Sequence, residues 1–327
     1  MNASKGPFHV IDRCEREAEV FAFWSLQERL MDTEFDNQKA RAAGWFRSLR
    51  DKIVATFEEL EKSHTEGVLS DHPPRKFEVR ATKRKGQEDE DAGGGLMSVL
   101  RGGRVFEKVG VNISTVFGTL SVTAQSEMMS RKALSDVEAD PRFWASGISL
   151  VAHMQNPHCP AVHMNTRMFW TPHAWWFGGG SDLNPCIEYE DDTTHFHTTQ
   201  ESYLKVHDAK HYPRFKQWAD EYFFIPHRGR ARGVGGIFVD DYCTGHWESD
   251  FALIQDIGRA FLPAFVPLVE KRRCQSWTDG DKDIQLVHRG LYAEYNLVYD
   301  RGTKFGLATG HDAEAVLMSL PPLAKWT

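Results

Sequence analysis

Polar side chains that could do chemistry alternate along one short segment in the middle of the chain. His163, Asn165 and Arg167 are spaced two residues apart, and an extended strand places residues with that spacing on one face. Ser149 and His153 belong to a second row of the same kind just upstream. An unpaired polar group in a dry core costs about 1–3 kcal/mol, so a strand face this polar is expected to line a pocket or solvent. The segment predicts a site where an imidazole, an amide and a guanidinium face a polar ligand together.

Two further features indicate what kind of ligand this would be. The loop His227–Arg232 contains three arginines, and guanidinium groups bind carboxylates through paired N–H donors. Together with Arg167, this loop suits a substrate that carries several carboxylates. The glycine-rich segments Gly178–Gly180 and Gly233–Gly236 match neither the dinucleotide-binding fingerprint nor the phosphate-binding P-loop. We interpret them as places where the backbone turns or approaches a neighbour closely.

Histidines are concentrated in the same part of the chain. Ten of the 15 lie between His153 and His246, and because imidazole is the commonest metal ligand, a metal-dependent hydrolase is one alternative. His207 and His211 have the i, i+4 spacing of a zinc-protease helix, but the glutamate that should follow the first histidine is missing. Histidines that are hydrogen-bonded in or beside a pocket are therefore the preferred interpretation.

The composition is that of an ordinary soluble globular protein. The chain has 327 residues, 41% of them hydrophobic and 26% charged, and a net charge of -7, which predicts no nucleic-acid partner. Five cysteines, none in a CxxC spacing, indicate a reducing compartment. The N-terminus lacks the pattern of a signal or transit peptide, and the longest uncharged run, 143–166, is too polar to cross a bilayer. We expect a cytoplasmic protein without a membrane span.

Hydrophobic periodicity predicts a helical start (1–64), then a run of strands, then mixed strands and helices. The expected helices cover 11–64, 191–204, 214–224, 251–269 (broken or kinked by its prolines) and 314–320, and the expected strands cover 76–82, 96–124, 142–170, 174–177, 235–241 and 291–299, with a further strand between 299 and 314. Segment 83–95 combines basic, acidic and glycine runs and predicts a mobile insertion. The order favours an α+β fold with a large antiparallel β-sheet flanked by helices on both sides, as a single domain over 1–327.

Long ordered motifs in the chain resemble one family, the oxygen-dependent coproporphyrinogen III oxidases. The motifs are Val105–Asn112, Trp175–Gly180 with Asp182 and Leu183, Trp218–Arg228, Arg232–Phe238, Glu294–Thr303 and Met318–Pro322. The resemblance implies oxidative decarboxylation of two propionates of coproporphyrinogen III to vinyl groups, which gives protoporphyrinogen IX in haem biosynthesis. It also implies molecular oxygen as co-substrate, no organic cofactor, and a homodimer to which the strand region from Tyr292 onward contributes.

The resemblance also assigns roles to individual residues. His163 matches a proton donor and Asp182 an aspartate placed against the pyrrole nitrogens. The positions that match substrate-binding residues are Ser149, Asn165, Arg167, Asp182 and the segment Gly310, His311 and Asp312. Bacterial relatives are described with a divalent metal and eukaryotic relatives without one, so the resemblance leaves a metal open. Its candidate ligands are His153, His163, His197 and His227.

The last of these segments departs from the family pattern. Family members usually read Gly-x-Arg-x-Glu-Ser there, whereas this chain reads Gly-His-Asp-Ala-Glu-Ala over 310–315. Asp312 thus replaces an arginine that would meet a propionate, and it reverses the local charge. A homologue that binds porphyrin with weakened catalysis is therefore a second alternative.

The charges suggest a working arrangement for the site. Arg167 and Asp182 are expected to pair with each other until the substrate arrives. Asp182 would then accept hydrogen bonds from pyrrole N–H groups, Arg167 and Asn165 would orient the reacting propionate, and His163 would supply a proton.

Overall fold

The computed structural model describes residues 34–86, 90–132, 138–172, 174–308 and 312–327. Contacts divide the chain into two units, 1–41 and 42–327. Of the first unit, only the beginning of helix α2 (Glu34–Ser63) is described, so the helix expected over 11–33 lies outside the described residues. The second unit holds the sheet and the candidate site.

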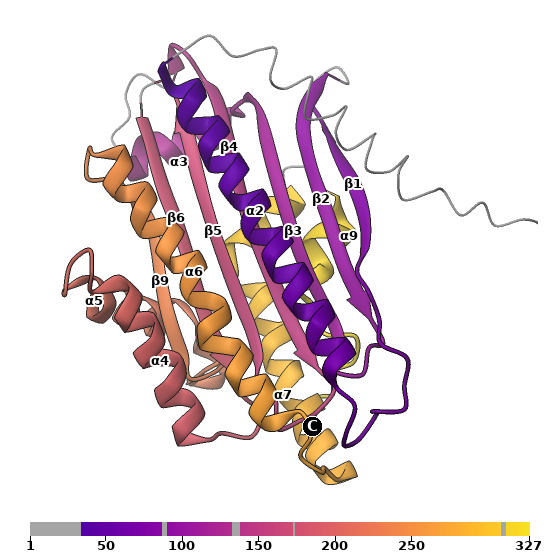
Figure 1. The fold of residues 1–327 in the computed structure, drawn as a ribbon. Coiled ribbons are helices and arrows are strands. Elements are labelled where there is room, and N and C mark those ends of the chain that lie inside the picture. The colour runs from indigo at the N-terminus through magenta and orange to yellow at the C-terminus, as the bar shows by residue number, and fades with distance from the viewer. Residues whose placement is uncertain (1–33, 87–89, 133–137, 173, 309–311) are drawn as a thin grey trace, which may run out of the picture. The chain divides into compact units, whose positions relative to one another are not determined.

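A seven-stranded sheet forms the centre of the second unit (Figure 1). Its strands lie in the order β1-β2-β3-β4-β5-β6-β9, and each pairs antiparallel with its neighbours. They are β1 Glu78–Lys85, β2 Asp91–Arg101, β3 Phe106–Thr119, β4 Arg142–Met154, β5 Ala161–Thr171, β6 Ala174–Asn184 and β9 Gly235–Tyr242; β7 Phe224–Ile225 and β8 Arg230–Ala231 pair separately. The predicted α+β class with a large antiparallel sheet is confirmed.

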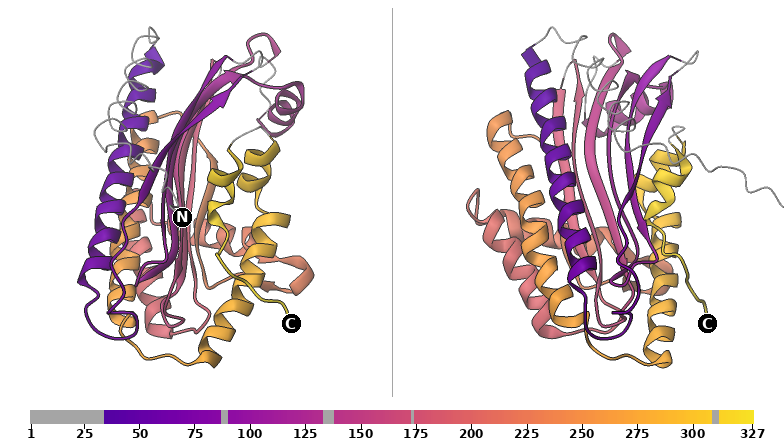
Figure 2. Two further views of the ribbon diagram at one scale, coloured as in Figure 1. Left: turned by 90° about the vertical axis from the view of Figure 1, so that its right-hand side faces the viewer. Right: turned by 45° about the vertical axis from the view of Figure 1, so that its right-hand side comes forward.

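Helices cover both faces of this sheet. The helices after α2 are α3 Val122–Lys132, α4 Glu190–Leu204, α5 His211–Tyr222, α6 Trp247–Arg272, α7 Asp279–Val298, α8 Arg301–Ala308 and α9 Ala313–Val316, with short 3₁₀ turns at Pro226–Arg228 and Leu317–Ser319. Figure 2 shows α6 and the part of α2 beyond Ala42 on one face, and α7 to α9 on the other. The expected flanking on both sides is confirmed.

The two faces of β5 differ as the alternation in the sequence predicts. Met164 and Met168 are fully buried, on the face that also carries Phe177, whose ring stacks 5.9 Å from that of Phe251 in α6. The ring of His153, on the opposite face of β4, lies edge-on to Tyr292 of α7, at 5.1 Å. The polar row therefore faces α7 and the apolar row faces α6.

The prediction of a mobile insertion over 83–95 is wrong. β1 continues to Lys85 and β2 begins at Asp91, so most of the segment is paired sheet. The glycines are required there, because a side chain on Gly94 would collide with the carbonyl of Thr82, and one on Gly95 with that of Ile113. A glycine run can mark close packing of strands as well as a loop.

The strand predicted over 291–299 is also wrong, because these residues belong to α7 and its C-terminal end. Thr278 and Asp281 form a capping box that starts the helix, which sets a helical period for the residues after it. Tyr292 and Tyr295, three residues apart, are both buried on one side of α7. The strand expected after residue 299 is likewise replaced by α8.

The strand expected to end at Phe177 runs on through the three glycines to Asn184.

α6 is one continuous helix across Pro263 and Pro267. Pro267 has no N–H, which frees the carbonyl of Pro263, and His195 Nε2 donates to that oxygen at 3.0 Å. α6 is the one helix of the described ranges that is long and apolar enough to cross a membrane, but 61% of its most apolar window is buried, as in a core helix.

Candidate active site

The polar row and its neighbours form one continuous surface across three strands. Cross-strand pairing aligns Ser149 with Asn165 and Gly180, aligns Gly147 with Arg167 and Gly178, and aligns Val151 with His163 and Asp182. We call these nine residues the site floor. Antiparallel register thus brings together residues that lie apart in the sequence. A loop of six residues (155–160) separates the first two strands, and a turn separates the second from the third.

The floor is flat because glycines occupy three of its nine positions. A Cβ on Gly178 would lie 3.0 Å from Arg167 Cζ and from Asp240 Oδ1, so a side chain there would push this guanidinium and its carboxylate partner out of position by a few tenths of an ångström. The side-chain oxygen of Asn165 is buried and has no hydrogen-bond partner in the described part of the chain. A floor of this kind suits a broad ligand that lies over several strands and offers a hydrogen-bond donor.

Asp182 is held by four hydrogen bonds at one end of the floor. Its Oδ1 accepts from His163 Nδ1 at 2.8 Å and from Arg232 Nη2 at 2.8 Å, and its Oδ2 accepts from Arg232 Nε at 3.0 Å and Asn184 Nδ2 at 2.8 Å. The side chain of Asp182 is 1% exposed and that of Arg232 is 2% exposed. Burial alone would raise the pKa of Asp182, but Arg232 and His163 outweigh it, so the pKa lies well below its usual range. Asp182 is therefore ionised at neutral pH.

Aromatic rings surround the guanidinium of Arg232. Its central carbon lies 4.3 Å from the ring centre of Phe223, 4.6 Å from that of Tyr295 and 4.8 Å from that of Tyr292. Cation–π contacts of this kind gain strength when they are removed from water. The two tyrosines come from α7, so α7 fixes Arg232, Arg232 fixes Asp182, and Asp182 fixes His163.

Arg167 does not pair with Asp182, contrary to the expectation from the sequence. Its Nη2 donates to Asp240 Oδ1 at 2.6 Å, and Arg301 Nη2 lies 3.2 Å from Asp240 Oδ2. Arg167 and Asp182 stand on opposite sides of the central row of the floor, and the nearer carboxylate comes from β9. Both residues belong to the floor, but Asp182 is 1% exposed and Arg167 is 38% exposed.

Most of the chain is similar in sequence to known proteins. Residues 41–327 match the sequence model of the family described as coproporphyrinogen III oxidase. The chain belongs to that family. A protein of Rickettsia bellii (strain RML369-C), named oxygen-dependent coproporphyrinogen-III oxidase, is 46% identical over 292 residues, which are 89% of this chain and 99% of that protein. A protein of the same name from Rickettsia peacockii (strain Rustic) is 44% identical over 290 residues, 88% of this chain and 98% of its own.

The departure from the family pattern at Asp312 has a structural explanation. Arg80 Nη1 lies 2.7 Å from Asp312 Oδ2, and Asp312 Oδ1 accepts from the backbone N–H groups of Glu314 and Ala315 at 3.0 and 3.2 Å. The reversed charge is therefore neutralised by Arg80 of β1 and used to cap α9. Gly310 and His311, assigned to the same segment, lie outside the described residues.

The four histidines that match metal ligands in bacterial members of the family do not converge. Two of them bind backbone oxygens, His153 that of Ser319 at 2.8 Å and His197 that of Val234 at 3.1 Å. His227 lies 2.7 Å from Glu294, and His163 is bound to Asp182. Within the described ranges no group of three His, Cys, Asp or Glu side chains could hold a metal ion. These residues do not fit one metal centre within a chain, and the metal-dependent hydrolase loses its structural support.

Sequence reasoning missed several partners of the floor. Asp240 was visible only as one of two carboxylates that end a strand, Arg301 as part of a family motif, and Arg232 as one arginine of a cationic loop. That loop is not a shared anion site, because Arg232 is bound to Asp182 while Arg228 donates to Glu294 at 2.9 Å. No local signal in the sequence distinguishes these partners from other charged residues.

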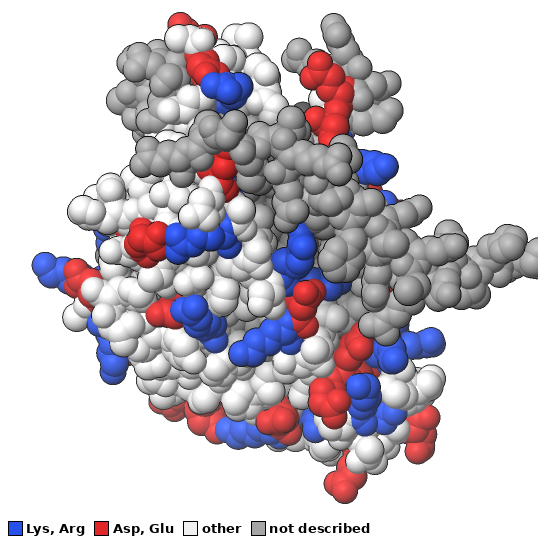
Figure 3. All heavy atoms as spheres, turned by 45° about the horizontal axis from the view of Figure 1, so that its top comes forward, with Lys and Arg blue, Asp and Glu red and all other residues white. Residues whose placement is uncertain are grey.

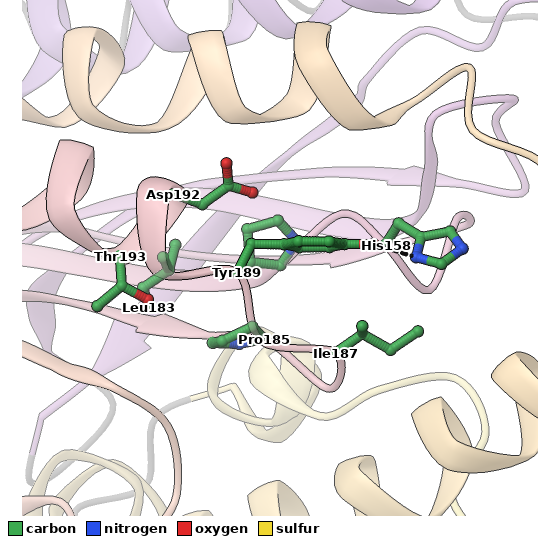
Figure 4. A pocket seen from close by; sticks show the side chains of 8 residues that line it. His158, Leu183, Pro185, Ile187, Tyr189, Asp192 and Thr193 are labelled. Atoms are coloured by element: carbon green, nitrogen blue, oxygen red, sulfur yellow. Dashed lines mark hydrogen bonds between the residues drawn. The ribbon is translucent and has the colours of Figure 1, made fainter.

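The small pocket in Figure 4 lies away from the floor. It is lined by His158, Pro160, Leu183, Pro185, Ile187, Tyr189, Asp192 and Thr193 and has no room for a water molecule. The Tyr189 hydroxyl lies 2.8 Å from His158 Nδ1 across it, and Leu183 points to the opposite face from its neighbour Asp182. Small-molecule sites usually measure about 300–1,000 Å³, so this pocket is too small for a large ligand.

The charges on the outer surface are mixed. On the face drawn in Figure 3, the acidic and basic side chains of the described residues are interspersed and form no continuous basic stripe. Nucleic-acid-binding proteins usually present such a stripe. The positive charge that a polyanionic ligand needs is instead local to the site, at Arg167 and Arg301, which are 38% and 47% exposed.

Proposed function

We propose that this protein is an oxygen-dependent coproporphyrinogen III oxidase of haem biosynthesis, which converts two propionate side chains of its substrate to vinyl groups and releases protoporphyrinogen IX. The observation that carries the proposal is the site floor, which is flat, spans three strands, and has Arg167 on one side and the His163–Asp182 pair on the other. A broad tetrapyrrole with peripheral carboxylates has the shape and charge to lie on such a surface.

The reaction balances with oxygen as the electron acceptor. At each reacting propionate the bond to the carboxylate carbon breaks and carbon dioxide leaves. The carbon next to the pyrrole ring loses one hydrogen, and a carbon–carbon double bond forms. The two electrons and this proton pass to oxygen, and one further proton taken from the site completes hydrogen peroxide. We propose that no organic cofactor takes part, and no step here needs a metal.

The residues of the floor divide this work between them. Arg167 binds the reacting carboxylate through N–H groups that Asp240 does not use, while Ser149 and Asn165 orient the rest of the side chain. A carboxylate only accepts, so His163 Nδ1 carries the proton shared with Asp182. His163 Nε2 has no partner in the described chain, and we assign to it the proton transfer.

Asp182 then acts through His163. Both of its oxygens are occupied in the structure, so a direct hydrogen bond to a pyrrole nitrogen would first break one that Asp182 already makes. Holding the imidazole in one tautomer and one orientation is the role that its contacts support.

A homodimer is also proposed. The resemblance implies one, and α7 together with the C-terminal tail exposes large apolar side chains: Ile284 is 50% exposed, Val298 47%, Leu323 62% and Trp326 56%. We propose that a second copy covers them, with a helix rather than a strand at the contact. Sedimentation of Val298→Asp, compared with wild type, tests this, and an unchanged oligomeric state would contradict it.

A cytoplasmic location is proposed from the cysteines. The four cysteines in the described ranges are free, as in a reducing compartment.

Oxygen uptake with coproporphyrinogen III tests the function directly. Two molecules of oxygen should be consumed, and two of carbon dioxide released, for each molecule of divinyl product detected by chromatography and fluorescence. Binding without oxygen uptake would instead support the weakened porphyrin-binding homologue. That alternative rested on Asp312, whose charge Arg80 neutralises.

A further inference from the structure

The end of β9 departs from regular pairing directly beside Arg167. Between the pairs Gly179–Val239 and Phe177–Tyr242, β6 has one residue, Gly178, and β9 has two, Asp240 and Asp241. This is a β-bulge. Asp241 adopts a left-handed conformation with φ of 55°, which is uncommon for a residue other than glycine. Bulges and strained residues of this kind often re-aim a neighbouring side chain at a functional site.

The bulge directs the carboxylate of Asp240 over Gly178 and into contact with the floor. A Cβ on Gly178 would lie 3.0 Å from Asp240 Oδ1. The same oxygen accepts the backbone N–H of Asp241 at 3.0 Å, so the strained residue itself orients the side chain. Asp240 is 9% exposed. Burial alone would raise its pKa, but Arg167 and Arg301 outweigh burial and lower it, so Asp240 is ionised at neutral pH.

Among the described residues, one N–H group of Arg167 and one of Arg301 contact the carboxylate of Asp240. Arg167 reaches Oδ1 from β5 and Arg301 reaches Oδ2 from the first turn of α8. The guanidinium of Arg301 also lies over the rings of Tyr222 and Phe238, at 5.1 and 5.8 Å. A guanidinium has five N–H donors, and the hydrogen bond that Arg167 makes to Asp240 in the described part of the chain uses one of them, which leaves others to bind a ligand. Asp240 therefore fixes the direction of the Arg167 guanidinium but does not use all of its N–H groups.

We propose that Asp240 is a positioning residue for catalysis: it aims Arg167 at the substrate carboxylate and, through Arg301, anchors the start of α8 beside the floor. This inference rests on the proposed function, because it takes Arg167 as the group that binds a propionate. Two like-charged guanidiniums repel each other, and without a carboxylate between them each would adopt several rotamers. Pre-organisation of a binding group shows mainly in affinity for the ligand.

Asp240→Asn tests the proposal because it keeps the shape and removes the charge. Asp256→Asn is the matched control, since Asp256 also joins two basic side chains, Arg259 at 2.7 Å and His207 at 2.8 Å, on α6 and away from the floor. We expect KM for coproporphyrinogen III to rise about tenfold in Asp240→Asn, with kcat changed less than about threefold. Asp256→Asn should keep wild-type kinetics.

A direct binding measurement separates affinity from KM. Coproporphyrin III, the oxidised tetracarboxylate, is titrated by fluorescence and should bind about tenfold more weakly to Asp240→Asn. A wild-type KM and affinity would overturn the inference, and so would tighter binding, which would make Asp240 a competitor of the substrate. If Asp240→Asn does not fold, Asp240→Ser removes the same charge in a smaller side chain and should raise KM to a similar extent, whereas a wild-type KM would overturn the proposal.

Arg167→Ala shows whether a negative result contradicts the inference about Asp240 alone or also the proposed function. If Arg167→Ala retains a wild-type KM, the assignment of Arg167 to the substrate fails, and the inference about Asp240 fails with it. If Arg167→Ala binds weakly while Asp240→Asn behaves as wild type, only the inference about Asp240 fails.

Discussion

The buried pair of Arg232 and Asp182 makes a quantitative prediction. Arg232→Met removes the guanidinium but keeps most of the volume, and it leaves Asp182 buried with a charge that His163 and Asn184 alone must compensate. Removing one partner of a buried ion pair costs about 3–5 kcal/mol. Since domains are stable by only about 5–15 kcal/mol, we expect a large fall in the free energy of unfolding and loss of activity at a lower temperature than in the wild type.

A double-mutant cycle measured by urea unfolding isolates the pair. Asp182→Asn alone should also destabilise the protein, because Arg232 is then buried among Phe223, Tyr292 and Tyr295 without an anion. The double variant should be more stable than the sum of the single losses predicts, because neither charge is left alone. A loss below about 1 kcal/mol in Arg232→Met, or strict additivity, would refute the account of Asp182 as a clamped carboxylate.

The pH dependence provides a second check on the same pair. The wild-type pKa of Asp182 is depressed, so the pair stabilises the fold above the pKa of unfolded aspartate, about 3.9, and this contribution is lost as pH falls through the lower folded value. In Arg232→Met, the guanidinium that outweighed the effect of burial is absent, so burial raises the pKa of Asp182. The stability difference between the variant and wild type should therefore be largest near neutral pH and should narrow toward pH 4.

Three further outcomes are expected. His163→Gln should lower kcat about 10²–10⁴-fold with little change in KM, measured by product formation, and a normal kcat would remove His163 from proton transfer. Gly178→Ala should reduce kcat/KM at least about tenfold by displacing the guanidinium of Arg167, whereas the control Gly44→Ala, in a helix with open space around it, should raise stability by about 0.5–1 kcal/mol and leave turnover unchanged. Treatment with a chelator should leave turnover intact, and loss of activity that a divalent metal restores would contradict the interpretation of the histidines.

The sequence could predict features that depend on local period and on long motifs. The polar row of β5 was recognised because residues two apart share a face in any strand, and the structure places His163, Asn165 and Arg167 as that rule requires. The same reasoning failed at 291–299, where alternation over nine residues also matched a helical period. The capping box at Thr278, thirteen residues before that segment, decided between the two.

The partners of the proposed catalytic groups were decided only by the tertiary structure. Arg167 lies 73 positions from Asp240 and Asp182 lies 50 positions from Arg232, and their pairing depends on β9 docking beside β6 with a bulge at Asp240. The residue types identify the charges that a carboxylate-rich substrate needs, but any nearby aspartate could have paired with Arg167. Coulomb attraction depends on distance in space and not on separation in the sequence. The fold alone therefore determined which carboxylate of the floor is neutralised by a buried arginine and which guanidinium is placed to bind the proposed substrate.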